Sequence, residues 1–183
     1  MGYETNKRTN AMTDTMTPEQ RHRCMSHIHS RGTKPELKVR QWLWHHGYRY
    51  RLNVKSVPGK PDIVMRPYRT AIFVNGCFWH GHEGCATFRM PKSNTPFWEA
   101  KIARNRQRDR ENYDLLYRNG WNVIVIWECQ LKPNAIEHTM REVEVLLNEN
   151  MLSRFKHATV QYADEEALPL AAEGEEDYNT NKQ

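Results

Sequence analysis

The sequence predicts an α/β fold in which a mixed central sheet is flanked by helices. Two observations lead to this prediction. Short apolar segments, typical of strands, are interspersed with longer segments that open on helix-capping signals. Their order is helix, helix, three strands, helix, strand, helix, with no internal repeat. A chain of 183 residues has room for one such domain with a substantial core.

Two helices are expected before the first strand. Thr17-Pro18-Glu19-Gln20 supplies an N-cap, a proline at the first helical position and a glutamine at the third, so a helix should run to about Ser30. Thr33-Lys34-Pro35-Glu36 repeats this capping box, and Gly47 ends the second helix. Residues 1–16 lack periodicity, as expected of a flexible lead.

Three strands are predicted next. We interpret Tyr48–Leu52 as a short strand, Asp62–Met65 as a second that opens on an acid, and Thr70–Val74 as its hairpin partner. Hairpin pairing should bring Asp62 beside Val74. Trp121–Trp127 is an almost continuous apolar segment, which indicates a strand buried on both faces in the middle of the sheet.

Two further helices surround the last strand. Thr95-Pro96 opens a long, strongly basic helix that should continue to roughly Arg118. Pro133 introduces a final helix. From residue 158 the chain is acidic and poor in core-forming side chains, so residues 158–183 are expected to form a disordered tail and the folded domain to span residues 17–157.

The charge is unevenly distributed along the chain. The tail carries seven acids against one lysine, a net charge of −6, so a total of +5 leaves +11 on residues 1–157. Such a basic body suggests a polyanionic partner, most often nucleic acid, although plain solubility would also explain it. No run of 18 apolar residues is present and the N-terminus is polar, so we expect a soluble, unexported protein of the cytoplasm.

A cluster of thiols and imidazoles follows the third strand. Cys77, His82 and Cys85 lie close together in a glycine-rich loop, and Cys129 follows the last strand. Three thiolates and one imidazole are a ligand set that structural zinc favours, and four protein ligands leave no open position. Two alternatives stay open, namely ordinary buried cysteines, or His80 as the ligand in place of His82.

Two residues near this loop indicate phosphodiester chemistry. Asp62 heads a strand of a helix-flanked sheet, where nucleases hold Mg²⁺ with a carboxylate. The Glu-x-Lys signature that usually accompanies such an acid is missing, so a Val74 carbonyl and a nearby imidazole would have to replace it. His80, if it does not bind zinc, can act as the general base. An aspartate after a proline is more often a simple strand or turn marker.

Phe78 and Trp79 are consecutive large aromatic residues on the same loop. Core packing explains most such pairs. Next to a metal site on a basic protein, they could instead form a wedge between base steps. Wedging costs least at a mismatch, and this would give selectivity for mispaired DNA.

These motifs resemble the very-short-patch-repair (Vsr-type) DNA mismatch endonucleases, over about Met25 to Cys129. The strongest elements are Val57–Asp62, Gly76–His80 with His82 and Cys85, Phe97-Trp98 with Lys101 and Asn105, and Gly120-Trp121 leading to Trp127–Cys129.

The resemblance implies a restriction-endonuclease-like fold and Mg²⁺-dependent nicking 5′ to the thymine of a T·G mispair, the lesion left when 5-methylcytosine deaminates. It implies the following site residues: Asp62 and Val74 at Mg²⁺, His80 as base, Glu36 and Asp109 as supporting acids, Cys77, His82, Cys85 and Cys129 at zinc, Met25, Phe78 and Trp79 as intercalating residues, and Lys60, Lys101 and Asn105 as DNA contacts. A monomer is expected, with a DNA cytosine-5 methyltransferase system and mismatch-repair proteins as possible partners.

The chain departs from the family pattern in two places. Val74 and Asn75 stand where some members carry Thr and His, so Asn75 is expected to hydrogen-bond a phosphate or water. The spacing from His82 to Cys85 is one residue longer than in some members. Two rival functions are a nuclease of the same fold with another DNA target, such as a restriction-associated or structure-specific enzyme, and a zinc-containing module that binds mispairs without cutting.

Overall fold

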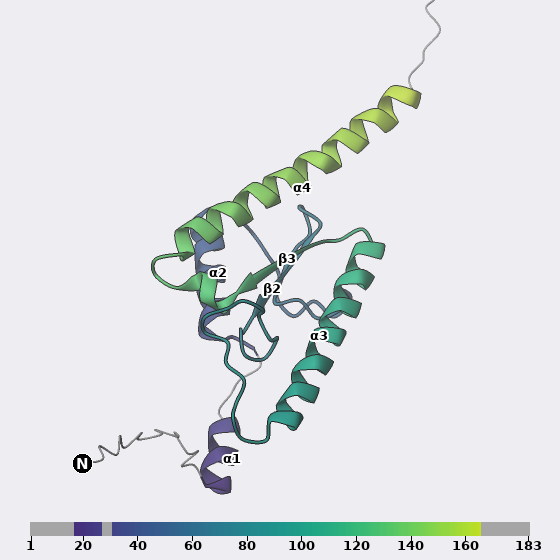
Figure 1. The fold of residues 1–183 in the computed structure, drawn as a ribbon. Helices are drawn as coiled ribbons and strands as arrows, with labels where there is room; N and C mark the ends of the chain where they lie inside the picture. The colour runs from purple at the N-terminus through teal and green to yellow at the C-terminus, as the bar shows by residue number, and fades with distance from the viewer. Residues whose placement is uncertain (1–16, 27–30, 166–183) are drawn as a thin grey trace, which may run out of the picture.

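A three-stranded sheet forms the centre of the molecule (Figure 1). The computed structural model describes residues 17–26 and 31–165. Within the sheet, β1 (Ile63–Met65) runs antiparallel to β2 (Thr70–Asn75), and β2 runs parallel to β3 (Asn122–Trp127). The predicted mixed sheet with a β1–β2 hairpin is therefore confirmed.

Helices cover both faces of the sheet (Figure 1). α3 (Thr95–Arg118) forms the long crossover that a parallel strand pair requires, and it packs on the face that carries Phe73. α2 (Lys34–His45) and α4 (Ile136–Glu165) pack on the opposite face, which carries Val74. Because side chains alternate along a strand, β2 contributes to both cores, and all six of its residues are buried.

The N-cap predicted for α2 is present, but the Glu36 half of the predicted capping box is made to Gly32 and not to the Thr33 backbone N–H. The Thr33 side chain accepts a hydrogen bond from the backbone N–H of Glu36. The Glu36 carboxylate in turn accepts hydrogen bonds from Gly32 N–H at 2.7 Å and from Thr33 Oγ1 at 2.9 Å, so both of its oxygens are held locally. α1 (Pro18–Ser26) starts as predicted, and residues 27–30 of that predicted helix lie outside the described residues.

The prediction that the last strand lies in the middle of the sheet is wrong. In the described sheet β2 is central and β3 is an edge strand. In β3 only Ile124 and Ile126 are buried, and both belong to the core under α2 and α4. Val123 points to the other face and is only partly buried there. The apolar run thus reflects one fully covered face and one partly covered face.

Two predicted element boundaries also differ. Tyr48–Leu52 is not a strand, because the chain meets β1 at one bridge alone, where Arg51 and Val64 exchange backbone hydrogen bonds of 2.8 and 2.9 Å. Asn53 follows with φ of +52°, a turn that leads the chain away from the sheet. At the other end, α4 continues to Glu165, so the first part of the predicted disordered tail is helical.

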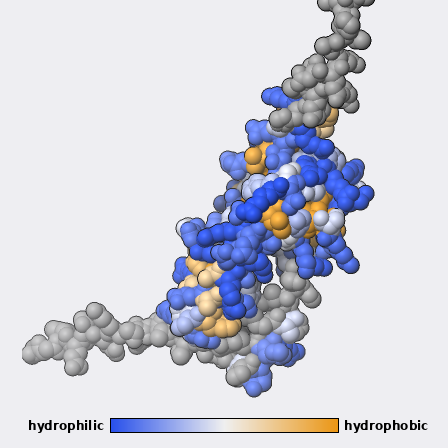
Figure 2. Space-filling view, turned by 90° about the vertical axis from the view of Figure 1, so that its right-hand side faces the viewer, coloured by the Kyte–Doolittle hydropathy of each residue, from blue (hydrophilic) through white to orange (hydrophobic). Residues whose placement is uncertain are grey.

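The described surface is mostly polar. Figure 2 shows hydrophilic side chains over most of one face, with small, separate hydrophobic patches. Among the described residues, no helix combines the length and apolar character needed to span a membrane.

Candidate active site

A cleft of about 1120 Å³ lies where β2 ends, between the N-terminus of α2 and one side of α3. Its walls come from segments that are far apart in the sequence. Of the residues predicted to form the site, it is lined by Glu36, Lys60, Asp62, Val74, Asn75, Trp79, His80, Lys101, Asn105 and Asp109. The fold therefore gathers most of the predicted site into one place.

Asp62 lies beside the end of β2. Its Oδ2 accepts a hydrogen bond from Val74 N–H at 2.8 Å, as the hairpin predicted. The N–H and C=O groups of a strand residue face the same neighbour, so the Val74 carbonyl is also directed to the side of Asp62. The β1–β2 pairing ends at Ile63 and Ile72, and it leaves this carbonyl out of the ladder. One carboxylate and one carbonyl oxygen are thus presented at the same edge.

The environment of Asp62 raises the pKa of its carboxyl group. Burial raises the pKa of Asp62 from 3.8 to about 6, and the negative charge of Glu36 adds to this shift. The Val74 N–H opposes it, as do the charges of His80 and Arg31. A cation bound next to the carboxylate would offset the effect of burial and lower this pKa again.

His80 is paired with an acid of α3. Its Nδ1 lies 2.5 Å from Asp109 Oδ2, and the two side chains are 23% and 14% exposed. A carboxylate at Nδ1 favours the tautomer that carries its proton there, which leaves Nε2 as a hydrogen-bond acceptor. The pair therefore presents a nitrogen that can accept a proton.

α3 also holds the backbone on either side of the histidine. Asn105 Nδ2 donates to the Trp79 carbonyl at 2.8 Å, and the Arg106 guanidinium donates to the Gly81 carbonyl. Arg106 also forms an ion pair with Glu83 at 2.6 Å. Sequence reasoning missed Arg106, because a helix so rich in basic residues gives no sign of which one turns towards the loop.

Gly81 packs so closely on α3 that a larger residue should displace the loop. Its φ is +61°, and an added Cβ would lie 2.5 Å from Ile102 Cγ2 and 2.7 Å from Arg106 Nε. If the chain has the nicking activity that its sequence predicts, Gly81→Ala should lower the nicking rate by roughly 10- to 100-fold, because a 1 Å shift of a catalytic group has effects of that size. Single-turnover nicking of a mismatched duplex measures the change.

Gly84→Ala is the matched control for this substitution. Gly84 has a similar φ of +67°, but an added Cβ would meet nothing within 4 Å. Both variants carry the strain of a left-handed alanine, on the order of 1 kcal/mol, so thermal unfolding should detect it in both. Equal loss of nicking in the two variants would show that contact with α3 is unimportant.

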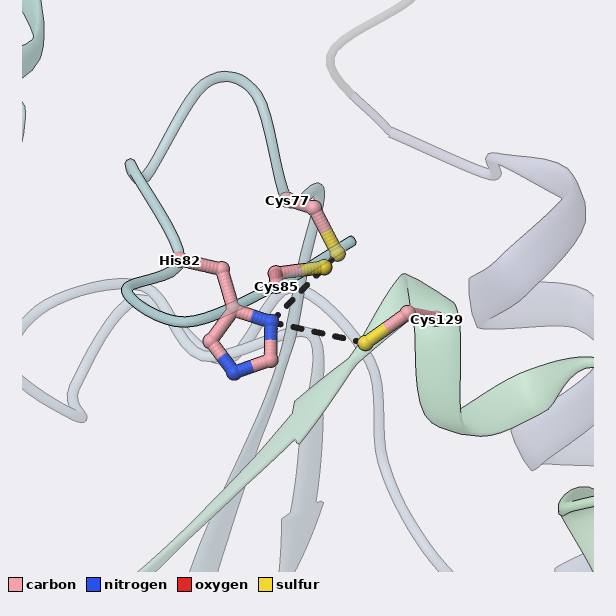
Figure 3. A group of neighbouring side chains, drawn as sticks. All are labelled: Cys77, His82, Cys85 and Cys129. Atoms are coloured by element: carbon pink, nitrogen blue, oxygen red, sulfur yellow. Dashed lines mark hydrogen bonds between the residues drawn. The ribbon is translucent and has the colours of Figure 1, made fainter. Parts of the chain in front are cut away.

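Four residues converge between the loop and η1 (Glu128–Leu131), and Figure 3 shows them side by side. This Cys/His cluster consists of Cys77, His82, Cys85 and Cys129, whose ligand atoms all lie within 4.8 Å of one another. His82 Nδ1 is 3.6 Å from Cys77 Sγ and 3.4 Å from Cys129 Sγ. Tetrahedral zinc, with Zn–S of about 2.3 Å and Zn–N of about 2.0 Å, would separate such atoms by about 3.5 Å.

The Cys/His cluster could therefore hold a metal ion, and the residues present fit a tetrahedral one. His82, not His80, is the histidine that belongs to it. The ring of His82 stacks on Trp127 with centroids 4.0 Å apart and parallel planes, which fixes its orientation. The sequence allowed either His80 or His82 as the metal ligand, and the structure places only His82 in the Cys/His cluster.

Phe78 and Trp79 belong to an aromatic cluster beside the cleft. Trp98 of α3 has its ring centroid 5.2 Å from that of Phe78 and 6.0 Å from that of Trp79, in edge-on arrangements. All three side chains are half-buried and lie outside both hydrophobic cores. Lys101 Nζ lies 5.5 Å from the Trp79 ring centroid. The sequence offered Trp98 as part of a motif but gave it no role.

Asn75 and Met25 are two further predicted site residues. Asn75 is 5% exposed, and its Nδ2 donates to Tyr113 Oη at 3.0 Å, so this amide nitrogen is directed to α3. Burial raises the pKa of Tyr113 to about 12, which keeps this hydroxyl protonated. Met25 lies on α1, but its side chain is outside the described residues.

The chain is similar in sequence to known DNA endonucleases. The family model described as DNA mismatch endonuclease Vsr matches residues 13–86. Type II nicking enzyme V.NmeAIP of Neisseria meningitidis is 50% identical over 125 residues, which cover 68% of this chain and 89% of that protein. Type II nicking enzyme V.XorIIP of Xanthomonas oryzae is 44% identical over 133 residues, 72% of this chain and 97% of that protein. DNA mismatch endonuclease Vsr of Escherichia coli is 39% identical over 121 residues, 66% of this chain and 77% of that protein.

These relatives define the class of protein as a DNA endonuclease. The cleft that gathers most of the predicted site residues accords with this class. The chain belongs to the Vsr family.

Proposed function

We propose that this endonuclease requires Mg²⁺ and nicks one DNA strand 5′ to the thymine of a T·G mispair left by deamination of 5-methylcytosine. The observation that carries the proposal is the cleft in which Asp62 and the His80–Asp109 pair lie beside an aromatic cluster. Metal-assisted hydrolysis needs a carboxylate and a proton acceptor, and selection of a mispair needs a probe of base stacking. The fold would be restriction-endonuclease-like.

The oxygens at the edge of the sheet suit Mg²⁺. Asp62 and the Val74 carbonyl would hold it, and Glu36, only 8% exposed, would add negative charge nearby. Mg²⁺ is typically bound by one or two carboxylates and keeps its other positions for water and substrate phosphates, so a sparse protein ligand set is appropriate. When bound, Mg²⁺ supplies positive charge that stabilises the phosphate under attack.

The other roles, namely proton acceptance, positioning of the loop and attraction of DNA, would be filled by side chains of the protein. His80 would take the proton of the attacking water at Nε2, while Asp109 holds the ring and stabilises the positive charge that forms on it. Asn105 acts as a positioning residue, because its amide holds the Trp79 carbonyl. Lys101 would place a positive charge for DNA next to the aromatic cluster.

We further propose that the metal in the Cys/His cluster is structural zinc. Four protein ligands leave no open position, so the ion would take no part in the hydrolysis. It would connect the loop that carries His80 to η1 at the end of β3. This connection would help to keep the loop folded.

The aromatic cluster should govern the preference for mispaired DNA. Phe78→Ala and Trp98→Ala should each reduce the ratio of T·G to T·A nicking by about 10-fold, since base–aromatic stacking contributes about 1–3 kcal/mol per base. Competition assays with the two duplexes measure the ratio. Phe155→Ala on α4 is the control, because Phe155 is 59% exposed and does not line the cleft. An unchanged ratio in both cluster variants would contradict the wedge.

A nicking assay on matched T·A and mismatched T·G duplexes, with Mg²⁺ or EDTA, tests the proposal itself. We expect a single nick in the T·G duplex with Mg²⁺ and none with EDTA. Equal cutting of both duplexes would favour the same-fold nuclease with another target, and tight binding without a cut would favour the binding module. A nick needs only one active site, so we expect activity from a monomer. A DNA cytosine-5 methyltransferase system would make the 5-methylcytosine whose deamination gives the substrate.

A further inference from the structure

A second cavity, of about 210 Å³, lies on the other side of the proposed metal site. It shares Glu36, Lys60 and Asp62 with the main cleft, so the two cavities are separated by little more than these side chains. Its remaining polar wall is formed by Arg31, Arg40 and Asn53. None of these three was singled out by the sequence, and none has a role in the proposed hydrolysis.

Among the residues that the structure describes, none pairs with the Arg40 side chain in a way that accounts for its position. It lies on α2 one helical turn after Glu36, where an ion pair between the two would be usual. The Glu36 oxygens are instead held by Gly32 N–H and the Thr33 hydroxyl. The buried Arg40 Nε makes no hydrogen bond, and the guanidinium forms no ion pair with any residue in the described ranges. A buried donor without an acceptor is unfavourable unless a ligand supplies one.

The backbone around this cavity is held in an uncommon conformation. Lys60 has φ of +53° although it precedes Pro61, and a residue before proline normally adopts an extended conformation. Asn53, on the same wall, has φ of +52°. Strain of this kind persists where the surrounding structure requires it, and it is frequent at ligand sites. This backbone conformation accompanies the position of Lys60 on the wall that both cavities share.

The charges on the wall favour an anion. Three cations, Arg31, Arg40 and Lys60, face two carboxylates, and Glu36 already accepts two hydrogen bonds. A guanidinium with free donors in a fork suits the oxygens of a phosphate. Consecutive phosphates of one DNA strand rise by only about 3.4 Å along the helix axis, and the shared wall includes Asp62 itself, so a phosphate next to one at Asp62 would be within reach of this wall.

We propose that the second cavity is a phosphodiester subsite, in which Arg40, together with Lys60 and Arg31, binds the phosphate next to the scissile one on the cleaved strand. This inference rests on the proposed function, because it takes the scissile phosphate to lie at Asp62. The subsite would fix the register of the strand over the carboxylate. It carries no base-specific contact, so it would act alike on all sequences.

The test replaces single phosphates of a T·G duplex by uncharged methylphosphonates, one at a time on either side of the cleavage position. Binding is measured in Ca²⁺, which keeps the duplex uncut. For the unmodified protein, one of the two flanking positions should weaken binding by about 10-fold. Arg40→Gln should weaken binding of the unmodified duplex by a similar factor and lower the slope of log K against log salt by about 1. At the flanking position where the methylphosphonate weakens binding, combining it with Arg40→Gln should weaken binding no more than either change alone.

Arg141→Gln is the matched control, because Arg141 is exposed on α4 and lines neither cavity. It should leave both the affinity and the salt slope unchanged. Additive losses from Arg40→Gln and the methylphosphonate, or an unmodified protein that tolerates both flanking replacements, would overturn the subsite. Failure to bind or nick any T·G duplex would instead overturn the proposed function.

Discussion

Asp62→Asn should abolish nicking and at the same time make the metal-free protein more stable. Asparagine keeps an oxygen for the Val74 N–H but removes the charge that would hold Mg²⁺. We expect at least a 10³-fold loss of nicking, since the metal-dependent stabilisation of the scissile phosphate is lost. Binding of a T·G duplex, measured by fluorescence anisotropy, should change by no more than a few-fold.

The gain in stability follows from the raised pKa of Asp62, from 3.8 to about 6. Between these values the folded protein holds a proton that the unfolded chain has released. The free energy of unfolding of the parent protein should therefore fall as pH rises through this window and then level off. With about 1.4 kcal/mol per pKa unit and an allowance for partial exposure, the cost at pH 7 is about 2 kcal/mol.

Thermal unfolding in EDTA measures this effect. Asp62→Asn should raise Tm at pH 7 by roughly 4–8 °C and should flatten the dependence on pH between 4 and 6. Asp114→Asn is the control, because Asp114 is an exposed acid of α3 that does not line the cleft. A variant that nicks normally would refute the proposed role of Asp62, and a lower Tm would refute the account of its burial.

Cys129→Ser should release the metal of the Cys/His cluster and inactivate the enzyme. Zinc in the purified parent protein should be close to one per chain, and the variant should hold well under half of that. Apparent binding energies of structural zinc are about 10–16 kcal/mol, so the loss of one thiolate should lower stability by several kcal/mol. Nicking should fall by about 100-fold or more even with Mg²⁺ present, because His80 lies on the loop that the cluster holds.

Atomic absorption and the nicking assay report the two parts of this expectation. Cys24→Ser is the control, since Cys24 is the one cysteine of the sequence outside the Cys/His cluster. Full zinc content in Cys129→Ser would rule out the four-ligand site. Full activity in a zinc-free preparation would show that the ion does not support the loop.

Local signals in the sequence predicted much of the fold. Capping at Thr33, the proline at the start of α3 and the apolar strands all correspond to elements of the structure. Local signals do not predict the position of a strand within the sheet, because that position depends on what packs on each face. The apolar run of β3 could not reveal that α3 covers its outer face only in part.

The same distinction holds for the site. Asp62, His80 and the Cys/His cluster could be predicted because their residue types and spacing are themselves chemical signals. Trp98, Arg106 and Arg40 could not, because each is one ordinary residue of a helix until the fold shows what it faces. Asn75 shows that a residue type does not by itself give an orientation, since its Nδ2 donates to Tyr113 on α3.

The two parallel strands end at the same edge of the sheet, and each leads within two residues into a member of the Cys/His cluster. With a metal bound, the chain from Cys77 to Cys129 becomes a closed ring that contains the whole of α3. Such a ring restricts how far the loop can move from the helix. We therefore expect His80, α3 and the aromatic cluster to open and close as one cooperative unit.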